Sequence, residues 1–110
     1  MSARKGRVVF LLELKPGAED AFLAAYEQIR HDIANGVPGH LVDQVCRRRG
    51  DGDGDAWIIT SEWETLDDFL AWERSEDHRR VAAPLRACIE RARSLKYDVV
   101  EETQAAGAAS

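Results

Sequence analysis

A histidine and its neighbouring tryptophans are the side chains of this sequence best suited to chemistry on a small molecule. His78 closes the stretch SEWETLDDFLAWERSEDH, which also contains Trp63 and Trp72. An imidazole that stays neutral can accept a proton near pH 7, and indole rings offer flat apolar surface. These residue types together predict a pocket that combines an aromatic wall with a proton acceptor.

The position of His78 along its helix decides whether it can act as that acceptor. Ser75 is typical of a residue that caps a helix start, and His78 then begins an apolar stripe that continues with Val81 and Leu85. Side chains on this stripe point toward the sheet, and the positive end of the helix dipole disfavours a charged imidazole. The alternative is a structural histidine that hydrogen-bonds a nearby carbonyl or hydroxyl, and periodicity leaves both interpretations open.

Two of the tryptophans share one face of a predicted strand. The residues that alternate onto this face are Trp57, Ile59, Ser61 and Trp63. Trp72, on the adjoining helix, extends the aromatic surface. Core packing is the alternative, because aromatic side chains dominate small cores. A serine between two tryptophans favours a pocket over a sealed core.

The periodicity of the apolar residues predicts four strands and two helical regions. Strands are expected at residues 7–14, 40–49, 56–63 and 94–101. Helices are expected at residues 18–35 and 65–92, the second divided at Ser75 and kinked or restarted at Pro84. The order β-α-β-β-α-β is the ferredoxin-like arrangement of an α+β protein, a four-stranded antiparallel sheet with its helices on one face. A second copy of the chain is the expected cover for the other face.

Residues 1–101 are expected to form this single domain, and residues 102–110 a frayed tail. The 110 residues carry a formal net charge of −5 with a pI near 5.2, which argues against nucleic acid or an anionic membrane as the main partner. No segment has the ~20 apolar residues that a membrane-spanning helix needs. Cys46 and Cys88 lack CxxC spacing, which indicates two unreactive thiols in a reducing cytoplasm.

Residues 51–62 match a calcium-binding loop only in part. The acidic residues at the first, third, fifth and twelfth positions of the EF-hand pattern are Asp51, Asp53, Asp55 and Glu62. Ala56, however, stands where the turn requires glycine, and a strand rather than a helix follows. The segment DGDGD is therefore predicted to be a polar hairpin turn. The three histidines of the chain lack metal-site spacing, so no metal is expected.

Two passages of the sequence resemble the antibiotic biosynthesis monooxygenase family. One is WETLDDF at residues 63–69, where a strand leads into an acidic helix start, and the other is WERSEDH at residues 72–78, with an S-x-x-H motif. Together with the β-α-β-β-α-β order, the resemblance covers residues 7–101. It implies a dimeric α+β barrel, a homodimer whose sheets pack face to face and whose protomers each hold a pocket between helices and sheet.

The resemblance also implies an activity. Some members oxidise aromatic polyketides such as anthrones to quinones with O2 and without flavin, haem or metal, so no cofactor is expected and O2 is the co-substrate. Related cyclases fold a linear poly-β-ketone with a helix tyrosine and a histidine; His78 matches the histidine, but Trp72 stands in the tyrosine's place. Haem-degrading relatives use a first-strand asparagine, which residues 7–14 lack.

We therefore expect a cofactor-independent monooxygenase that oxidises an anthrone or hydroquinone in antibiotic biosynthesis. His78 would remove a proton or accept a hydrogen bond, with Trp72 beside it in the catalytic set. The residues expected to bind the aromatic polyketide are Trp57, Trp63, Ser61, Tyr26, Phe10, Leu12, Phe69 and Gln44, with Ser61 or Gln44 orienting a carbonyl. The alternatives are a polyketide cyclase or aromatase of the same fold, and a non-catalytic dimer that binds a small aromatic molecule.

Overall fold

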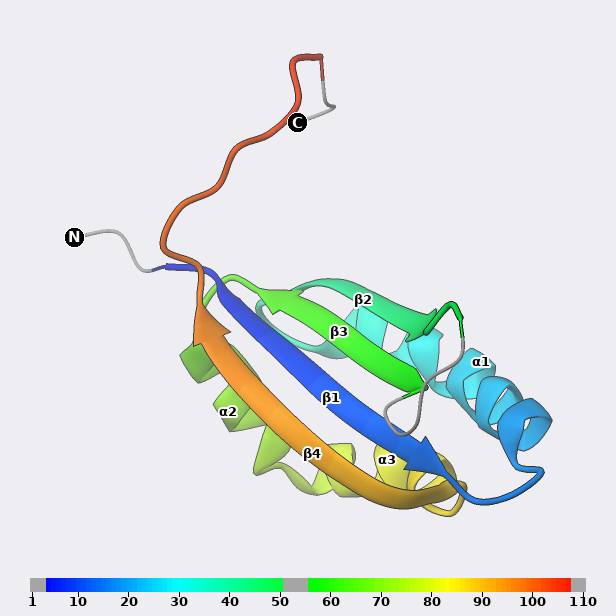
Figure 1. Cartoon of the computed structure of the whole chain (residues 1–110). Coiled ribbons are helices and arrows are strands. Elements are labelled where there is room, and N and C mark those ends of the chain that lie inside the picture. The colour runs from blue at the N-terminus through cyan, green and yellow to red at the C-terminus, as the bar shows by residue number, and fades with distance from the viewer. Residues whose placement is uncertain (1–3, 51–55, 108–110) are drawn as a thin grey trace.

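The computed structural model describes residues 4–50 and 56–107 of the chain (Figure 1). Its elements are β1 (Gly6–Leu14), α1 (Glu19–Gly36), β2 (His40–Arg47), β3 (Trp57–Trp63), α2 (Leu66–Glu73), α3 (Glu76–Arg86) and β4 (Ile89–Asp98). The predicted order is confirmed, and the second helical region is divided at Ser75 as its capping pattern indicated. The hairpin turn predicted for residues 51–55 lies outside the described residues.

The strands form one antiparallel sheet in the order β2-β3-β1-β4, and the helices all lie on one face of it (Figure 1). The central strand β1 pairs with β3 on one side and with β4 on the other. This is the ferredoxin-like α+β arrangement that the sequence predicted. Because the edge strands are β2 and β4, the exposed arginine at the end of β2, Arg47, lies on a solvated edge.

Alternation along the two inner strands selects the side chains that face the helices. Val8 on β1 lies opposite Ser61 on β3, and Leu12 lies opposite Trp57. These four side chains and Trp63 are all buried. The predicted inward face of residues 57–63 is therefore confirmed.

A close approach at Gly6 positions α2 against the start of β1. A Cβ atom on Gly6 would come within 2.6 Å of the Leu66 Cα atom, which leaves no space for any other residue. Thr65 caps the helix, because its hydroxyl accepts a hydrogen bond from the Asp68 N–H at 3.1 Å. One turn later, Phe69 is buried on the helix face that meets the sheet.

The last helix is shorter than its periodicity predicted. α3 ends at Arg86, and Ile89 and Ala92 belong to β4, where they pair with β1. Pro84 lies in the final turn and lacks the N–H that would continue the helical hydrogen bonds. The chain then turns at Cys88. Its carbonyl accepts a hydrogen bond from the backbone N–H of Lys15, the residue after β1, at 2.9 Å. Pro84 therefore lies inside a helix that continues to Arg86, and the expected restart after it is wrong, because β4 follows.

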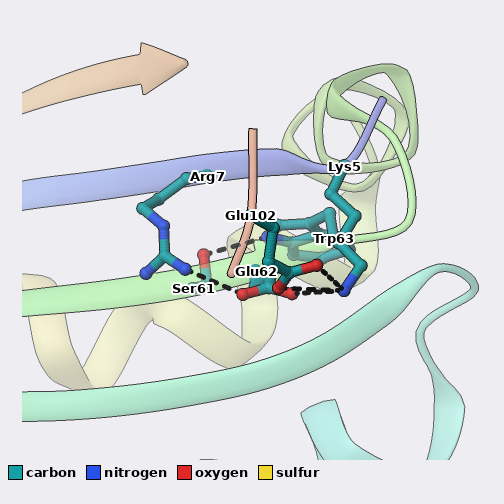
Figure 2. Close-up of polar contacts among 6 residues, drawn as sticks. All are labelled: Lys5, Arg7, Ser61, Glu62, Trp63 and Glu102. Carbon is teal, nitrogen blue, oxygen red and sulfur yellow. Dashed lines mark hydrogen bonds and ion pairs between the residues drawn. The ribbon is translucent and has the colours of Figure 1, made fainter. Parts of the chain in front are cut away.

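The sheet face away from the helices has an apolar centre and a charged end. Its central side chains alternate with the buried ones and are only partly exposed; they are Val9, Leu11, Ile58 and Leu95. At the end near Gly6, Glu62 pairs with Arg7 at 2.7 Å and with Lys5 at 3.2 Å, and Lys5 also reaches Glu102 at 3.2 Å (Figure 2). Exposed ion pairs of this kind contribute little stability individually.

The chain after β4 leads away from the sheet (Figure 1). β4 ends at Asp98, three residues before the predicted end at 101, and the described residues after it form neither helix nor strand. Near its start this segment is held by the Val99 N–H, which donates to the Lys5 carbonyl at 2.8 Å. The domain limit at residue 101 and the frayed tail beyond it stay predictions.

No helix among residues 4–50 and 56–107 has the length and apolar character needed to cross a membrane. Cys46 and Cys88 are both free thiols, the first partly exposed and the second buried. The reducing, cytoplasmic location stays a prediction.

Candidate active site

A cavity lies between the sheet and the helices. Most of its lining is apolar, and its polar groups are supplied by Tyr26, Asp43, Ser61 and His78. The predicted site residues that line it are Phe10, Tyr26, Ser61, Trp63, Phe69, Trp72 and His78. A second apolar hollow also includes Phe10 and His78 in its lining, so the imidazole borders both spaces.

The hydroxyl of Ser75 joins the two helices that carry the catalytic candidates. It donates a hydrogen bond to the Trp72 carbonyl at the end of α2, at 2.7 Å, and accepts one from the His78 N–H in the first turn of α3, at 3.1 Å. This elbow brings the two rings together: the Trp72 and His78 centroids are 5.5 Å apart at an interplanar angle of 78°. The predicted inward position of His78 follows from this break between the helices.

Burial and charge both disfavour a protonated imidazole at His78. The side chain is half-buried, and desolvation, together with the positive charge of Arg86, lowers the pKa of His78 below its ordinary 6.5. The carboxylate of Glu73 and its backbone carbonyl oppose this shift but do not reverse it. At neutral pH the imidazole is therefore uncharged and can accept a proton.

The serine between the tryptophans has a specific partner. The Trp63 indole Nε1–H donates to the Ser61 hydroxyl oxygen at 2.9 Å, and both side chains are buried (Figure 2). This bond uses one lone pair of the Ser61 oxygen and leaves its hydroxyl proton and its other lone pair available. Trp63 is further held edge-to-face by Phe69, with centroids 5.4 Å apart.

Three residues expected in the site lie elsewhere. Trp57 packs edge-to-face on Phe22 in the core, with centroids 5.7 Å apart, and does not line the cavity. Leu12 is buried in the same core and borders only the second hollow and a third one near the end of β1. Gln44 is exposed, because it pairs with Thr60 on the sheet face away from the helices. The expectation that Gln44 orients a substrate carbonyl is corrected accordingly.

The cavity is lined instead by Asp43, the residue before Gln44, whose carboxylate sequence reasoning missed. Asp43 lies opposite Ser61 in the sheet, and its Oδ2 atom accepts a hydrogen bond from the Tyr26 hydroxyl at 2.8 Å. Its Oδ1 atom is 3.6 Å from Nε2 of His40. Burial raises the pKa of Asp43, while the hydrogen bond from Tyr26 and the nearby His40 oppose that rise.

A strand irregularity that the sequence does not reveal explains why Asp43 was missed. His40 pairs with Trp63 and Val42 with Glu62, so Leu41 is an extra residue in the register of β2. This bulge puts His40 and Asp43 on the same face, although strict alternation would separate them.

No group of three or more His, Cys, Asp or Glu side chains that could hold a metal ion occurs in the part of the chain that the structure describes. The expectation that no metal or cofactor takes part stays a prediction.

The fold and the cavity together define a class: ferredoxin-like α+β proteins with an aromatic-lined space beneath their helices. Residues 6–84 match the family model described as antibiotic biosynthesis monooxygenase. The chain belongs to this family, and the resemblance seen in its sequence is confirmed.

Curated relatives of this chain come from Streptomyces, and one of them is named as a polyketide synthase. The 42.8 kDa protein in the whiE locus of Streptomyces coelicolor is 42% identical over 97 residues, and the polyketide synthase CurD of Streptomyces cyaneus is 40% identical over 101 residues. The matches cover 88% and 92% of this chain but only 24% and 26% of those proteins. The chain thus spans about a quarter of the length of the curated relatives it matches.

Solved structures with different activities share the fold. SnoaB, a cofactor-independent oxygenase from Streptomyces nogalater, superimposes with a TM-score of 0.74 at 19% identity, covering 91% of this chain and 97% of that one. A hydroxynitrile lyase from Passiflora edulis gives a TM-score of 0.73 at 16% identity, covering 92% and 98%. Identities this low establish the fold alone, and the two reactions differ, so the reaction must be argued from the site.

Loss of the Ser75 hydroxyl should loosen the elbow between α2 and α3. We expect Ser75→Ala to lower the free energy of unfolding by about 1 kcal/mol, the usual cost of losing a helix cap, as measured by urea denaturation. Ser75→Thr keeps a donor and an acceptor and should stay close to the unsubstituted protein. Equal stability of the alanine and threonine variants would contradict the bridging role.

The charges beside His78 should move its pKa in opposite directions. Arg86→Gln removes a positive charge and should raise the pKa of the imidazole toward 6.5, whereas Glu73→Gln removes a negative one and should lower it further. NMR titration of the His78 ring protons measures both shifts. An unchanged pKa in both variants would show that burial alone sets this pKa, and shifts of the same sign would contradict the opposing roles of the two charges.

Proposed function

We propose that this protein oxidises a hydroxylated aromatic polyketide of the anthrone or hydroquinone type with O2 and without a cofactor. The observation that supports this most strongly is the half-buried His78 imidazole against the Trp72 ring in a mostly apolar cavity, where burial lowers its pKa and favours the neutral form. Family membership and the similarity to a protein named polyketide synthase CurD support this class of substrate.

In the proposed reaction His78 acts as a general base and later returns the proton that it removes. It takes a proton from the methylene carbon of the anthrone, and the resulting carbanion transfers an electron to O2. Recombination of the radical pair forms a carbon–oxygen bond, and the imidazolium returns its proton to the peroxide oxygen. Loss of water from the hydroperoxide then leaves the quinone carbonyl. One anthrone and one O2 thus yield one quinone and one water, with no external reductant.

The cavity walls suit the intermediates of this sequence. Trp63, Phe69 and Trp72 provide aromatic surface along which a flat ring system can pack. Apolar surroundings also limit access of water, which would otherwise trap the carbanion and release superoxide. In this scheme Trp72 contacts the substrate and holds the His78 ring from one side.

A cyclase of the same fold would need a proton donor as well as a base. Tyr26 is the phenol that lines the cavity, so an aldol closure that uses His78 and Tyr26 is the second candidate. The two reactions differ in their requirement for oxygen, because a cyclisation proceeds under anaerobic conditions and the oxidation does not. Binding of aromatic ligands without any product would instead indicate a non-catalytic function.

Removal of the His78 imidazole should abolish most of the oxidation. With 1,8-dihydroxyanthracen-9(10H)-one as substrate, we expect His78→Ala to lower kcat by roughly 10²- to 10⁴-fold, the range typical of a lost general base. O2 uptake and quinone absorbance measure the rate. His31→Ala, which changes an exposed histidine on α1, is the matched control and should keep full activity. Undiminished turnover by His78→Ala would remove the base from the mechanism.

We also propose that a second copy of the chain covers the outer face of the sheet. In the part of the chain that the structure describes, the helices all lie on the opposite face of the sheet (Figure 1), so none covers the apolar centre formed by Val9, Leu11, Ile58 and Leu95. Solved structures of the same fold include proteins described as dimeric, from Bacteroides fragilis and Thermobifida fusca. Burial of such a face between two copies removes apolar surface from water.

A charge at the centre of that face should therefore dissociate the dimer. We expect Leu11→Arg to shift the molar mass measured by light scattering from that of a dimer to that of a monomer, because an arginine buried between the sheets lacks a partner. Leu23→Arg changes an exposed leucine on α1, 43% exposed, and should leave the mass unchanged. A monomeric unsubstituted protein would contradict the proposal directly.

A further inference from the structure

The polar end of the cavity has an acceptor atom that the protein itself leaves open. Oδ2 of Asp43 is bound by the Tyr26 hydroxyl at 2.8 Å. Among the described residues, the nearest polar side-chain group to Oδ1 is Nε2 of His40 at 3.6 Å, a contact longer than an ordinary hydrogen bond that nevertheless lowers the pKa of Asp43. A carboxylate oxygen that lines an apolar cavity and has only this long contact can accept a hydrogen bond from a ligand.

The surroundings of Asp43 hold this oxygen in place. The His40 side chain is only 7% exposed, packs edge-to-face on Trp63 with centroids 5.1 Å apart, and has no hydrogen-bond partner for its buried Nε2 among the described residues. Burial and the neighbouring Asp43 raise the pKa of Tyr26, so its hydroxyl keeps its proton and goes on donating to Oδ2. Tyr26 and His40 therefore act as positioning residues for the carboxylate.

The charges that face this end of the cavity come from several elements. On α1, Glu27 and Arg30 flank Tyr26 but are exposed, and α3 contributes the His78 imidazole across the cavity. The described lining contains no lysine or arginine. A ligand that carries its own carboxylate would therefore meet Asp43 without a fixed cation to offset the repulsion.

We propose that Asp43 selects the ligand by accepting a hydrogen bond from one of its hydroxyl groups, so that the cavity prefers a phenol over the corresponding ether or carboxylic acid. This inference rests on the proposed function, because it takes the ligand to be an aromatic polyketide. It adds a residue that decides which substituents such a ligand can carry. A methyl ether offers no proton to Oδ1, and a carboxylate adds a second negative charge.

Three anthraquinones that differ at one position test this selection. The probes are 2-hydroxyanthraquinone, 2-methoxyanthraquinone and anthraquinone-2-carboxylate, and their binding is measured by quenching of tryptophan fluorescence. We expect the hydroxyl compound to bind about tenfold more tightly than the ether, since hydrogen bonds to charged acceptors are among the stronger ones. The carboxylate should bind more weakly than either.

Two substitutions on the same strand separate the effect of Asp43 from general changes in the protein. Asp43→Asn keeps the size of the side chain but removes its negative charge. The factor by which the hydroxyl compound binds more tightly than the carboxylate compound should therefore fall by about tenfold or more. Gln44→Leu changes the adjacent residue, which faces the other side of the sheet, and should leave all three constants unchanged. Identical ratios in the unsubstituted protein and in Asp43→Asn would overturn the inference, as would tighter binding of the carboxylate by the unsubstituted protein.

The binding assay and the oxidation assay fail independently. If Asp43 sets the ligand preference but no O2 is consumed with an anthrone, the selection stands and the proposed oxidation falls. If anthrone oxidation proceeds and the ligand ratios do not respond to Asp43→Asn, the oxidation stands and the selection falls.

Discussion

The hydroxyl of Ser75 is the interaction on which the geometry of the cavity depends. By bonding the carbonyl of Trp72 and the N–H of His78, it ends one helix and begins the next within a single turn. A continuous helix would carry the imidazole round to another face, because successive residues advance by 100° about the axis. The elbow instead sets the two rings in contact and directs the histidine toward the sheet. The chemistry proposed for His78 is thus a consequence of a helix cap.

Burial favours the neutral forms of both titratable groups that line the cavity, His78 and Asp43, although it shifts their pKa values in opposite directions. It lowers the pKa of His78 and raises that of Asp43, so at each end the neutral form gains relative to the charged one. The residues next to each group then act differently on its charged form. Tyr26 donates a hydrogen bond that stabilises the carboxylate, whereas Arg86 further disfavours the imidazolium. His78 and Asp43 line the same cavity, and the proposed neutral hydroxylated ligand would add no net charge to it.

Sequence periodicity located the features that repeat regularly and missed those that depend on a single irregularity. Alternation along residues 57–63 identified the inward face with Ser61 and Trp63, and the capping pattern at Ser75 turned His78 inward. It could not place Asp43, because the bulge at Leu41 shifts the register of β2 by one residue and leaves Gln44 on the outer face. Trp57 was assigned to the correct face but lies too far along the strand to reach the cavity, a distance that depends on how the helices cross the sheet.

The state of the phenol hydroxyl bears on which reaction the cavity favours. A cyclase that pairs a tyrosine with a histidine needs a tyrosine whose proton is available to the substrate. Here the resemblance places Trp72 at that position, and the phenol of Tyr26 comes from a different helix and already donates to Asp43. Its raised pKa makes the proton harder to release than that of a free tyrosine. The proposed oxidation needs one base, and with His78 in that role the hydrogen bond from Tyr26 to Asp43 stays intact; this is our reason for proposing oxidation ahead of cyclisation.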